Sequence, residues 1–192
     1  MNLINISKSY DDKIILKNVN LSFCDNEIVA ITGKSGVGKT TLLNIIAGLT
    51  SYDGKIENGG SVAYMMQDDV FVENLSVLDN LRLFTRKTKS QVLEMLSALG
   101  LEKFAGEFPS TLSGGMQRRI SFLRALHFDA DILLLDEPFK SLDESTKRDC
   151  VAYLKADLQK KPRLCIIVSH DVNELATLSP RIVQFFWGGG KN

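Results

Sequence analysis

A glycine-rich segment in the first quarter of the chain has the residue types needed to hold a phosphate group. It reads, in order, Gly33, Lys34, Ser35, Gly36, Val37, Gly38, Lys39, Thr40 and Thr41. The segment, called the phosphate loop below, fits the pattern Gly-x-x-x-x-Gly-Lys-Ser/Thr, in which glycines let backbone N–H groups turn inward around phosphate oxygens. A lysine at position 39 can reach the β- and γ-phosphates of a nucleotide, and the hydroxyl of Thr40 can bind Mg²⁺. The residues therefore predict a site for nucleotide phosphates.

The stretches on either side of the phosphate loop are those that would position it. Residues 27–32 are apolar and largely β-branched, as expected of a buried parallel strand. Residues 42–49 are nearly all apolar and predict a buried helix, whose N-terminus would add roughly half a positive charge. The alternative is a glycine-rich turn with an incidental lysine, and a chance match in such a chain is on the order of one in a hundred. The order strand, loop, helix favours the phosphate site.

A pair of carboxylates follows the most apolar strand that the sequence predicts. Residues 132–135 are all Ile or Leu, and Asp136 and Glu137 come directly after them. Ligands bind at the carboxyl ends of strands in open α/β sheets, which places both acids at such an edge. Consecutive residues of a strand face opposite ways, so we expect the two acids to have different tasks. Asp136 suits Mg²⁺, and Glu137 is free to orient or deprotonate water.

A second loop that could receive an anion precedes a predicted helix. Ser113, Gly114 and Gly115 stand before an apolar-periodic stretch that includes Ile120. One interpretation is a loop with a serine N-cap. The other is a second anion site, made from a hydroxyl, free N–H groups and a helix N-terminus. The residues alone leave both open.

Two more side chains could contact a nucleotide, and for each there is a plainer interpretation. His170 follows the predicted strand 164–168, where a histidine is most often a surface residue but can also contact a γ-phosphate. Tyr10 ends the first predicted strand. Packing at the rim of the core is the favoured interpretation for a lone tyrosine there, and stacking on a purine ring is the other.

Composition limits the class of protein. The chain has 192 residues, 44% hydrophobic and 24% charged, with zero net charge and a pI near 6.7, which gives no indication of a nucleic-acid-binding face. No apolar run approaches the roughly 20 residues that span a bilayer, and the first residues do not resemble a signal peptide. Cys24, Cys150 and Cys165 lack metal-site spacing, so we expect reduced thiols in a cytosolic protein.

The pattern along the chain predicts the fold class. Strands alternate with helices after residue 27, which indicates an α/β protein with a mainly parallel sheet. Residues 2–7 and 13–23 predict antiparallel strands before that. Helical spacing follows at 76–81 and 90–99. Near the end we expect a short helix, a last strand and a disordered tail, at residues 174–178, 181–187 and 188–192.

Taken together and in order, these motifs resemble the ATP-binding cassette ATPases, and more narrowly the nucleotide-binding subunits of ABC transporters. The resemblance covers nearly the whole chain. It is carried by the phosphate loop, Gln67, residues 112–117 (Leu-Ser-Gly-Gly-Met-Gln), residues 135–138 (Leu-Asp-Glu-Pro), residues 141–143 (Ser-Leu-Asp) and His170. It implies a single ATPase domain over residues 1–192, with a P-loop NTPase core at 1–67 and 129–192. That core would carry a small N-terminal antiparallel β arm, and an inserted α-helical subdomain would span 68–128.

The resemblance also implies a role for each matching residue. Glu137 would be the catalytic base, His170 the switch histidine on the γ-phosphate, and Gln67 the residue that senses Mg²⁺ and the attacking water. Tyr10 would stack on adenine. Thr40, Gln67 and Asp136 would serve the metal, while Ser113, Gly114 and Gly115 would cap the nucleotide of an opposite subunit. Asp143 would lie in the loop that crosses the dimer interface.

The partners that the resemblance implies are ATP, Mg²⁺, a second subunit and a membrane permease. The second subunit would be another copy of this chain or a homologous one, joined head to tail with ATP between the two. The chain would be cytoplasmic and peripheral on the inner face of the cell membrane through its permease. We expect no nucleic acid among its partners.

The chain departs from the family pattern at three points. Only 28 positions separate Lys39 from Gln67, so we expect a trimmed hairpin in the antiparallel arm. Lys140 takes the first place of the usual Ser-Ala-Leu-Asp or Ser-Gly-Leu-Asp, so a contact across the dimer would differ. The sequence stops soon after His170, so we expect no C-terminal regulatory domain that would indicate a substrate.

The resemblance is closest to importers of the nitrate, sulfonate and taurine type. The alternatives are the motor of an exporter or lipoprotein-release system, and a soluble ABC ATPase acting on DNA, ribosomes or iron–sulfur assembly. A permease would dock beside Gln67 through some of six apolar residues, each of which could instead belong to the core. These are Met65, Met66, Phe71, Val72, Leu75 and Val77.

Overall fold

A five-stranded sheet forms the centre of the molecule. The computed structural model describes residues 1–11, 13–171 and 173–185. In spatial order the strands of the central sheet are β5 (Val62–Met65), β6 (Ile132–Asp136), β7 (Leu164–Val168), β3 (Ile28–Thr32) and β8 (Arg181–Gln184), and all neighbours are parallel. Every residue of β6 and β7 is buried, which explains why all of them except Asp136 are apolar.

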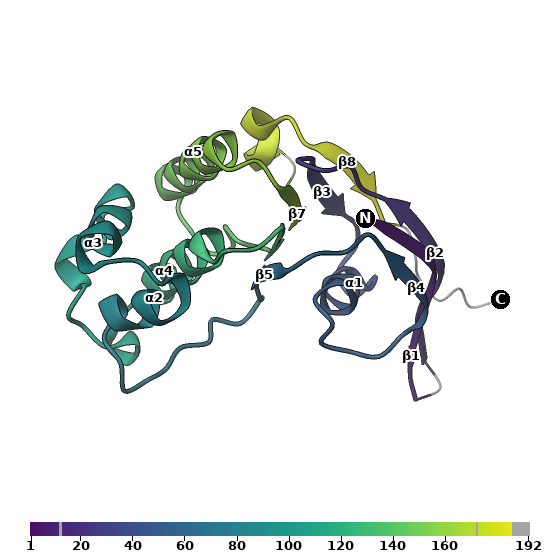
Figure 1. Ribbon diagram of the computed structural model, residues 1–192, viewed down its shortest axis with the longest axis horizontal. Helices are drawn as coiled ribbons and strands as arrows, with labels where there is room; N and C mark the ends of the chain where they lie inside the picture. The colour runs from purple at the N-terminus through teal and green to yellow at the C-terminus, as the bar shows by residue number, and fades with distance from the viewer. Residues whose placement is uncertain (12, 172, 186–192) are drawn as a thin grey trace.

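Alternate residues of the central strands contribute to two different apolar cores, one on each face of the sheet. Leu133 and Leu135 of β6 pack with the long helices, whereas Ile132 and Leu134 pack with α1 (Lys39–Ile46) on the opposite face. The period of two in a strand requires this division. Figure 1 shows the resulting layers, with α1 on one side of the sheet and α4 and α5 on the other.

The second sheet is antiparallel and closes the core around α1. It contains, in spatial order, β2 (Lys13–Ser22), β1 (Asn2–Tyr10) and β4 (Asp53–Glu57). Leu3, Ile6 and Leu16 of this sheet are buried against Leu42 and Leu43 of α1. The antiparallel arm expected from the sequence is therefore confirmed, with β4 as its third strand.

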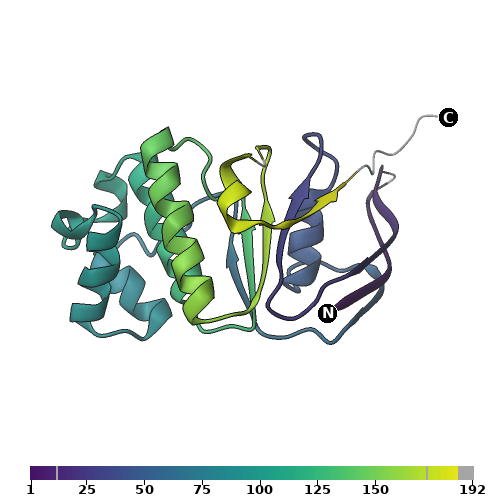
Figure 2. The same cartoon turned by 90° about the horizontal axis from the view of Figure 1, so that it is seen from above.

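In the part of the chain that the structure describes, four more α-helices and three short 3₁₀ helices complete the fold. Beyond α1 they are α2 (Val77–Thr85), α3 (Lys89–Ala98), η1 (Glu102–Phe104), η2 (Pro109–Thr111), α4 (Gly114–His127), α5 (Glu144–Lys160) and η3 (Asn173–Leu178). In Figure 2 the helical part lies at one end and the antiparallel sheet at the other. Within the described residues, none of the helices has the length and apolar character to cross a membrane.

The α/β class expected from the sequence is confirmed, and the main differences lie at the C-terminal end and beside β5. The helix expected at 174–178 is the 3₁₀ helix η3. The strand expected at 181–187 is β8, which ends at Gln184, and residues 186–192, which include the expected tail, lie outside the described residues. Met65 and Val77 are each 1% exposed, so the docking hypothesis is wrong for these two and they belong to the core.

Candidate active site

The carboxyl ends of four central strands meet at one edge of the sheet, and the candidate residues follow them. The phosphate loop follows β3, Gln67 lies just beyond β5, Glu137 follows β6, and His170 comes shortly after β7. Parallel strands all point the same way, so residues that are far apart in the sequence are delivered to one place. This is the structural reason that the motifs can form a single site.

Two glycines of the phosphate loop are required for different reasons. Gly36 has φ +76°, and a Cβ added to it would meet nothing within 4 Å, so only its left-handed backbone calls for glycine. Gly38 has φ +101°, and a Cβ there would lie 2.7 Å from Leu16 Cδ2 of the antiparallel sheet. The antiparallel β arm therefore packs closely against the phosphate loop where α1 begins, and leaves no room for a side chain at position 38.

Lys39 is held by the loop that it follows. Its side chain is buried, and Nζ donates hydrogen bonds to the carbonyls of Gly33 at 2.9 Å and Lys34 at 3.0 Å. Burial lowers the pKa of Lys39, while the negative charges of Glu137 and Asp136 act in the opposite direction. The ammonium group is thus fixed at the centre of the loop, with carboxylates close enough to affect it.

Asp136 is the most enclosed carboxylate of the site. It is 1% exposed, and neither of its carboxylate oxygens has a hydrogen-bond partner among the residues that the structure describes. Burial raises the pKa of Asp136, and the neighbouring Thr40, Arg118 and Lys39 offset this only in part. A buried carboxylate without partners is costly unless a cation completes it.

Glu137 lies in a strained turn and is held at both oxygens. β6 ends at Asp136, and Glu137 has φ +48°, so this left-handed backbone, rather than strand alternation, sets its direction. Its Oε1 lies 2.6 Å from Nε2 of His170, and its Oε2 lies 3.2 Å from Nζ of Lys140. Burial acts to raise the pKa of Glu137, but the hydrogen bond from Lys140 and the electrostatic effect of His170 and Lys140 outweigh it and lower the pKa.

A cavity of about 560 Å³, called the central cavity below, joins these groups. Its lining contains Ile15, Ser35, Gly36, Gly38, Lys39, Thr40, Thr41, Gln67, Glu137, Phe139, Lys140, Lys147, Ser169, His170, Asp171 and Glu174. The structure therefore brings the phosphate loop, the acid after β6, the histidine after β7 and Gln67 to one opening. Asp136 is buried and does not belong to the lining.

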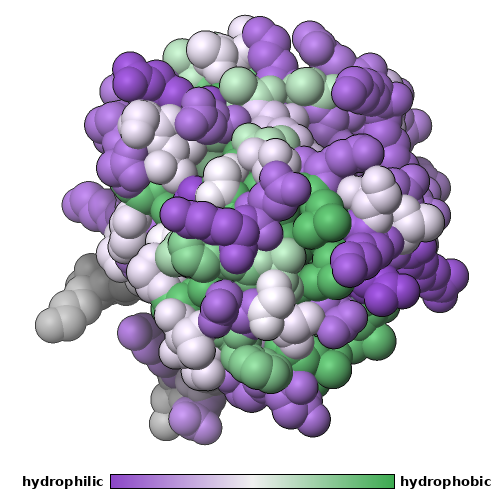
Figure 3. Space-filling model, turned by 90° about the vertical axis from the view of Figure 1, so that its left-hand side faces the viewer, coloured by the Kyte–Doolittle hydropathy of each residue, from purple (hydrophilic) through white to green (hydrophobic). Residues whose placement is uncertain are grey.

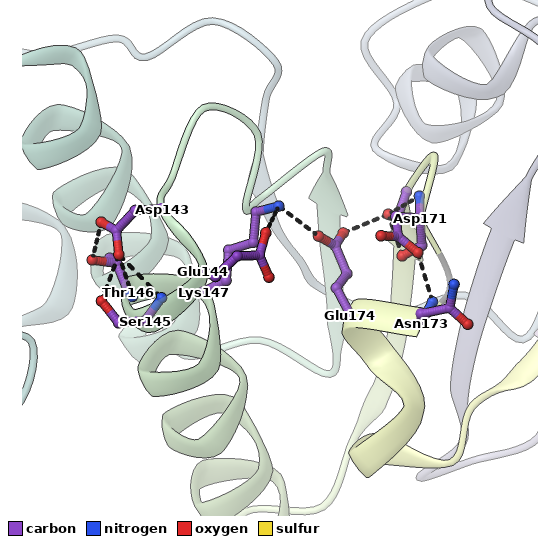
Figure 4. A network of polar contacts seen from close by, with 9 residues as sticks. Asp143, Glu144, Ser145, Thr146, Lys147, Asp171, Asn173 and Glu174 are labelled. Carbon is purple, nitrogen blue, oxygen red and sulfur yellow. Dashed lines mark hydrogen bonds and ion pairs between the residues drawn. The ribbon is translucent and has the colours of Figure 1, made fainter.

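The four candidate residues expected to meet a second subunit all lie outside the lining of the central cavity. Ser113 caps α4, accepting a hydrogen bond from Met116 N at 3.4 Å, so its N-cap interpretation is confirmed. Gly114 and Gly115 form the first turn of the same helix. Asp143 caps α5 by accepting from the backbone N–H groups of Ser145 and Thr146, as Figure 4 shows. Their roles toward a second subunit remain predictions.

Tyr10 also lies outside that lining. It ends β1 and is 46% exposed, and the ammonium of Lys8 lies 4.7 Å from the centre of its ring. A cation above the ring stabilises an exposed aromatic side chain. The ring is accessible, and its stacking on adenine remains a prediction.

Sequence reasoning missed a polar network on the η3 side of the central cavity. The Ser169 hydroxyl lies 2.5 Å from Oε1 of Glu174 and accepts a hydrogen bond from Asp171 N at 3.0 Å. Lys147 of α5 lies 3.9 Å from Oε2 of Glu174 (Figure 4). Burial raises the pKa of Glu174. The polar residues directly after β7 were a signal for part of this network, but nothing in the sequence indicated that α5 would contribute a lysine.

The comparison with protein families agrees with this geometry. A family described as "ABC transporter" matches residues 16–140, which is well over half of the chain. The chain belongs to the ABC transporter family. It is one of the ATP-binding subunits of that family, which are ATPases.

Named relatives of this ABC ATPase include subunits of two import systems. It is 40% identical over 190 residues to the aliphatic sulfonates import ATP-binding protein SsuB 1 of Rhodococcus jostii, covering 95% of this chain and 78% of that protein. It is 33% identical over 198 residues to the sulfate/thiosulfate import ATP-binding protein CysA of Synechocystis, covering 93% of this chain and 56% of that protein. The resemblance to sulfonate-type importers is thus confirmed at the level of sequence.

A solved cassette has the same fold as this ABC ATPase. The dimeric post-hydrolysis structure of the ATP-binding cassette MJ0796 bound to ADP and Pi matches it with a TM-score of 0.85 and 30% identity. The match covers 96% of this chain and 93% of that one. ATP binding by the family and the fold class are therefore both supported by a structure.

Proposed function

We propose that this ABC ATPase energises a membrane transporter, an importer of a small solute, by closing on ATP as a head-to-tail dimer and opening after hydrolysis. The main support for this proposal is the position of the motifs relative to the central cavity. The central cavity is lined by most of the phosphate loop, Glu137 and His170, whereas Ser113 and Asp143 of the same chain lie outside it. A site whose remaining motifs face elsewhere is complete only when a second subunit supplies them.

The residues fit Mg²⁺ together with ATP. Among the described residues, no three or more histidine, cysteine, aspartate or glutamate side chains gather into a metal site. Mg²⁺ ordinarily binds through one or two carboxylates plus substrate phosphates and water, so it needs no such cluster. Asp136 would hold the ion with its partnerless buried carboxylate, together with the hydroxyl of Thr40. The ion would neutralise charge on the phosphates.

The chemistry assigned to the chain is in-line attack of water on the γ-phosphoryl group. Lys39 would exchange its loop carbonyls for phosphate oxygens, because hydrogen bonds between charged groups are the stronger ones. Glu137 is ionised at neutral pH, since its pKa is lowered, so it can accept a proton from the water. His170 would orient Glu137 and then contact the γ-phosphate, and Gln67 would sense the metal and the water. Phosphoryl transfer needs this positioning more than it needs covalent help.

The partners belong to the same proposal. The named relatives are import ATP-binding proteins, which supports a separate permease and a place on the inner face of the cell membrane. The permease would choose the transported molecule. The division into a core of 1–67 and 129–192 and a helical subdomain of 68–128 is also proposed, with α2, α3 and α4 in the latter.

An apolar groove is available for the permease. A cavity of about 340 Å³ lies beside the segment that follows β5 and contains Met66, Val70, Phe71, Phe84 and Phe128 in its lining. Figure 3 shows hydrophobic side chains gathered among hydrophilic ones on the helical end of the molecule. Methionine and aromatic side chains suit an adaptable groove for a partner's helix. Of the six apolar residues suggested by the sequence, Met66, Phe71 and Val72 line this groove.

Light scattering tests the dimer. We expect wild-type protein to be monomeric without nucleotide and Glu137→Gln to become dimeric with Mg-ATP, since the amide cannot accept the proton and the closed state persists. Ser113→Arg in the Glu137→Gln background should abolish the shift by placing bulk and charge at the interface. A dimer that forms equally well without ATP, or with Ser113→Arg present, would contradict closure on the nucleotide.

A further inference from the structure

Arg118 of α4 is buried between two segments of the active site. The residue is 5% exposed, and its Nη1 donates hydrogen bonds to the carbonyls of Met66 at 3.0 Å and Gln67 at 2.9 Å. Its Nη2 donates to the carbonyls of Asp136 at 2.6 Å and Glu137 at 2.8 Å. One guanidinium group therefore contacts the backbone of both Gln67 and Glu137.

The contacts of Arg118 occur where backbone pairing between β5 and β6 ends. The last paired residues are Met65 and Leu135. The next positions on each strand, which begin with Met66 and Asp136, are joined by Arg118 instead of by each other. The side chain thus replaces the backbone hydrogen bonds between the strands and holds the two strand ends together, directly before Gln67 and Glu137 of the central cavity.

The chemistry of this position requires arginine. The guanidinium group presents its N–H donors in a rigid planar fork, so its two terminal nitrogens can serve two segments at once. A lysine ammonium is a point charge at the end of a flexible stem and cannot reach both sides with the same geometry. Asp69 supplies the carboxylate that balances the charge, at 3.1 Å from Nη1.

We propose that Arg118 is a positioning residue for hydrolysis, which fixes the backbone of Glu137 relative to that of Gln67. The proposal rests on the proposed function, since it depends on the roles of those two residues. It also links the groove to the chemistry, because Met66 lines the groove and is held by the same guanidinium as Glu137. A shift of the segment after β5 on docking would therefore move the catalytic base.

The chain offers a matched control in Arg163. It is also 5% exposed, and it donates to two backbone carbonyls, those of Leu126 and Phe128, and to the carboxylate of Asp157 at 3.2 Å. These contacts lie at the opposite end of the sheet from the central cavity, before β7 begins. Replacing Arg163 reproduces the loss of a buried arginine without touching Gln67 or Glu137.

The test compares Arg118→Lys with Arg163→Lys in the full-length protein. ATP affinity, kcat, KM and the melting temperature are measured for both and for Glu137→Gln. We expect both lysine variants to lose similar thermal stability. Arg118→Lys alone should lose kcat, by at least tenfold and up to about a hundredfold, which is the scale of a small misplacement of catalytic groups, with KM and ATP affinity within threefold of wild type.

The outcomes separate the two proposals. If Arg118→Lys keeps kcat within twofold of Arg163→Lys while Glu137→Gln is inactive, the positioning role is wrong and the proposed function stands. If Glu137→Gln remains active, the proposed base itself is wrong. Should the lysine variant not fold, Arg118→Gln against Arg163→Gln is judged by the same criteria, because the amide can donate to only one of the two segments.

Discussion

The carboxylate of Glu137 is ionised, and neighbouring side chains fix its orientation. Its lowered pKa keeps it ionised at neutral pH, which a proton acceptor needs, and the same lowering makes it a weaker base. His170 and Lys140 each hold one of its oxygens. The orientation of this group, rather than its basicity, is therefore what the protein controls. Lys140, at which the chain departs from the expected family pattern, supplies one of the two contacts.

Two substitutions separate binding from chemistry at the residue scale. Glu137→Gln should bind Mg-ATP normally and lose nearly all hydrolysis, because the amide keeps the shape and cannot accept the proton. Lys39→Ala should instead weaken ATP binding, since a charge-assisted contact with phosphate is lost. Calorimetry and a phosphate-release assay distinguish the two. Hydrolysis by Glu137→Gln at half the wild-type rate or more, or unchanged ATP affinity in Lys39→Ala, would remove that residue from its role.

Residues of the site could be predicted where they belong to a short contiguous pattern. The phosphate loop and the acid pair are such patterns, and the structure brings most of the former and Glu137 to one cavity. Lys140 and Arg118 could not be assigned in this way. Lys140 contacts the carboxylate of Glu137, and Arg118 contacts its backbone carbonyl. In the sequence, each of the two looks like an ordinary surface cation.

At the scale of elements, α4 and α5 are joined by a half-buried histidine. Nε2 of His127 on α4 lies 2.8 Å from the hydroxyl of Tyr153 on α5, and the two rings pack edge to face. Burial lowers the pKa of His127 to about 4, and the positive charges of Lys87, Arg163 and Lys161 act in the same direction. His127 is therefore neutral in the folded protein at neutral pH.

Acid should loosen this contact before it affects most carboxylates. The unfolded chain binds a proton at His127 near pH 6.5, whereas the folded chain does so only near pH 4, so stability falls as the pH drops between these values. At pH 5 the loss is on the order of 1–2 kcal/mol. Urea unfolding at pH 7 and pH 5 measures it, and His127→Gln should show a smaller difference. An equal difference in wild type and His127→Gln would contradict the assignment.

The elements themselves were largely predictable because their apolar periods are clear. Strands and helices alternate as expected after residue 27, and the β arm is antiparallel. The segment around β5 was harder to interpret. Met65 and Val77 have the same residue types as a docking surface, and only the packing of α4 against both α2 and β5 places them in the core. Spacing cannot separate a groove from a core over so short a stretch.

At the scale of the whole molecule, the groove and the central cavity lie on either side of one short segment. Residues 66–72 contribute Gln67 to the cavity, and Met66 and Phe71 to the groove. The guanidinium of Arg124 lies 5.4 Å from the centre of the Phe71 ring, which fixes the ring at the groove wall. A partner that binds in the groove and a nucleotide that binds in the central cavity must therefore act on the same short segment.

The groove can be tested by truncating one side chain. Phe71→Ala should leave the isolated subunit folded and able to bind ATP, and should prevent co-purification with its permease, because docking of this kind depends on a few apolar anchors. Leu83→Ala is the control, since Leu83 is 57% exposed on α2 and lies outside the groove lining. Wild-type yield of the complex with transport intact would exclude Phe71 as an anchor. A fall of many degrees in melting temperature would place it in the core instead.

The hydrogen bonds from Lys39 to its own loop have a consequence for recognition. Because the ammonium group of Lys39 already binds the carbonyls of Gly33 and Lys34, the loop is held in its conformation by its own lysine. A triphosphate then meets a rigid receptor and has only to exchange partners with one side chain. The entropy cost of ordering the loop is incurred during folding, so nucleotide binding includes little of it. Selectivity for the nucleotide then depends on its charge and on how well its shape matches the loop.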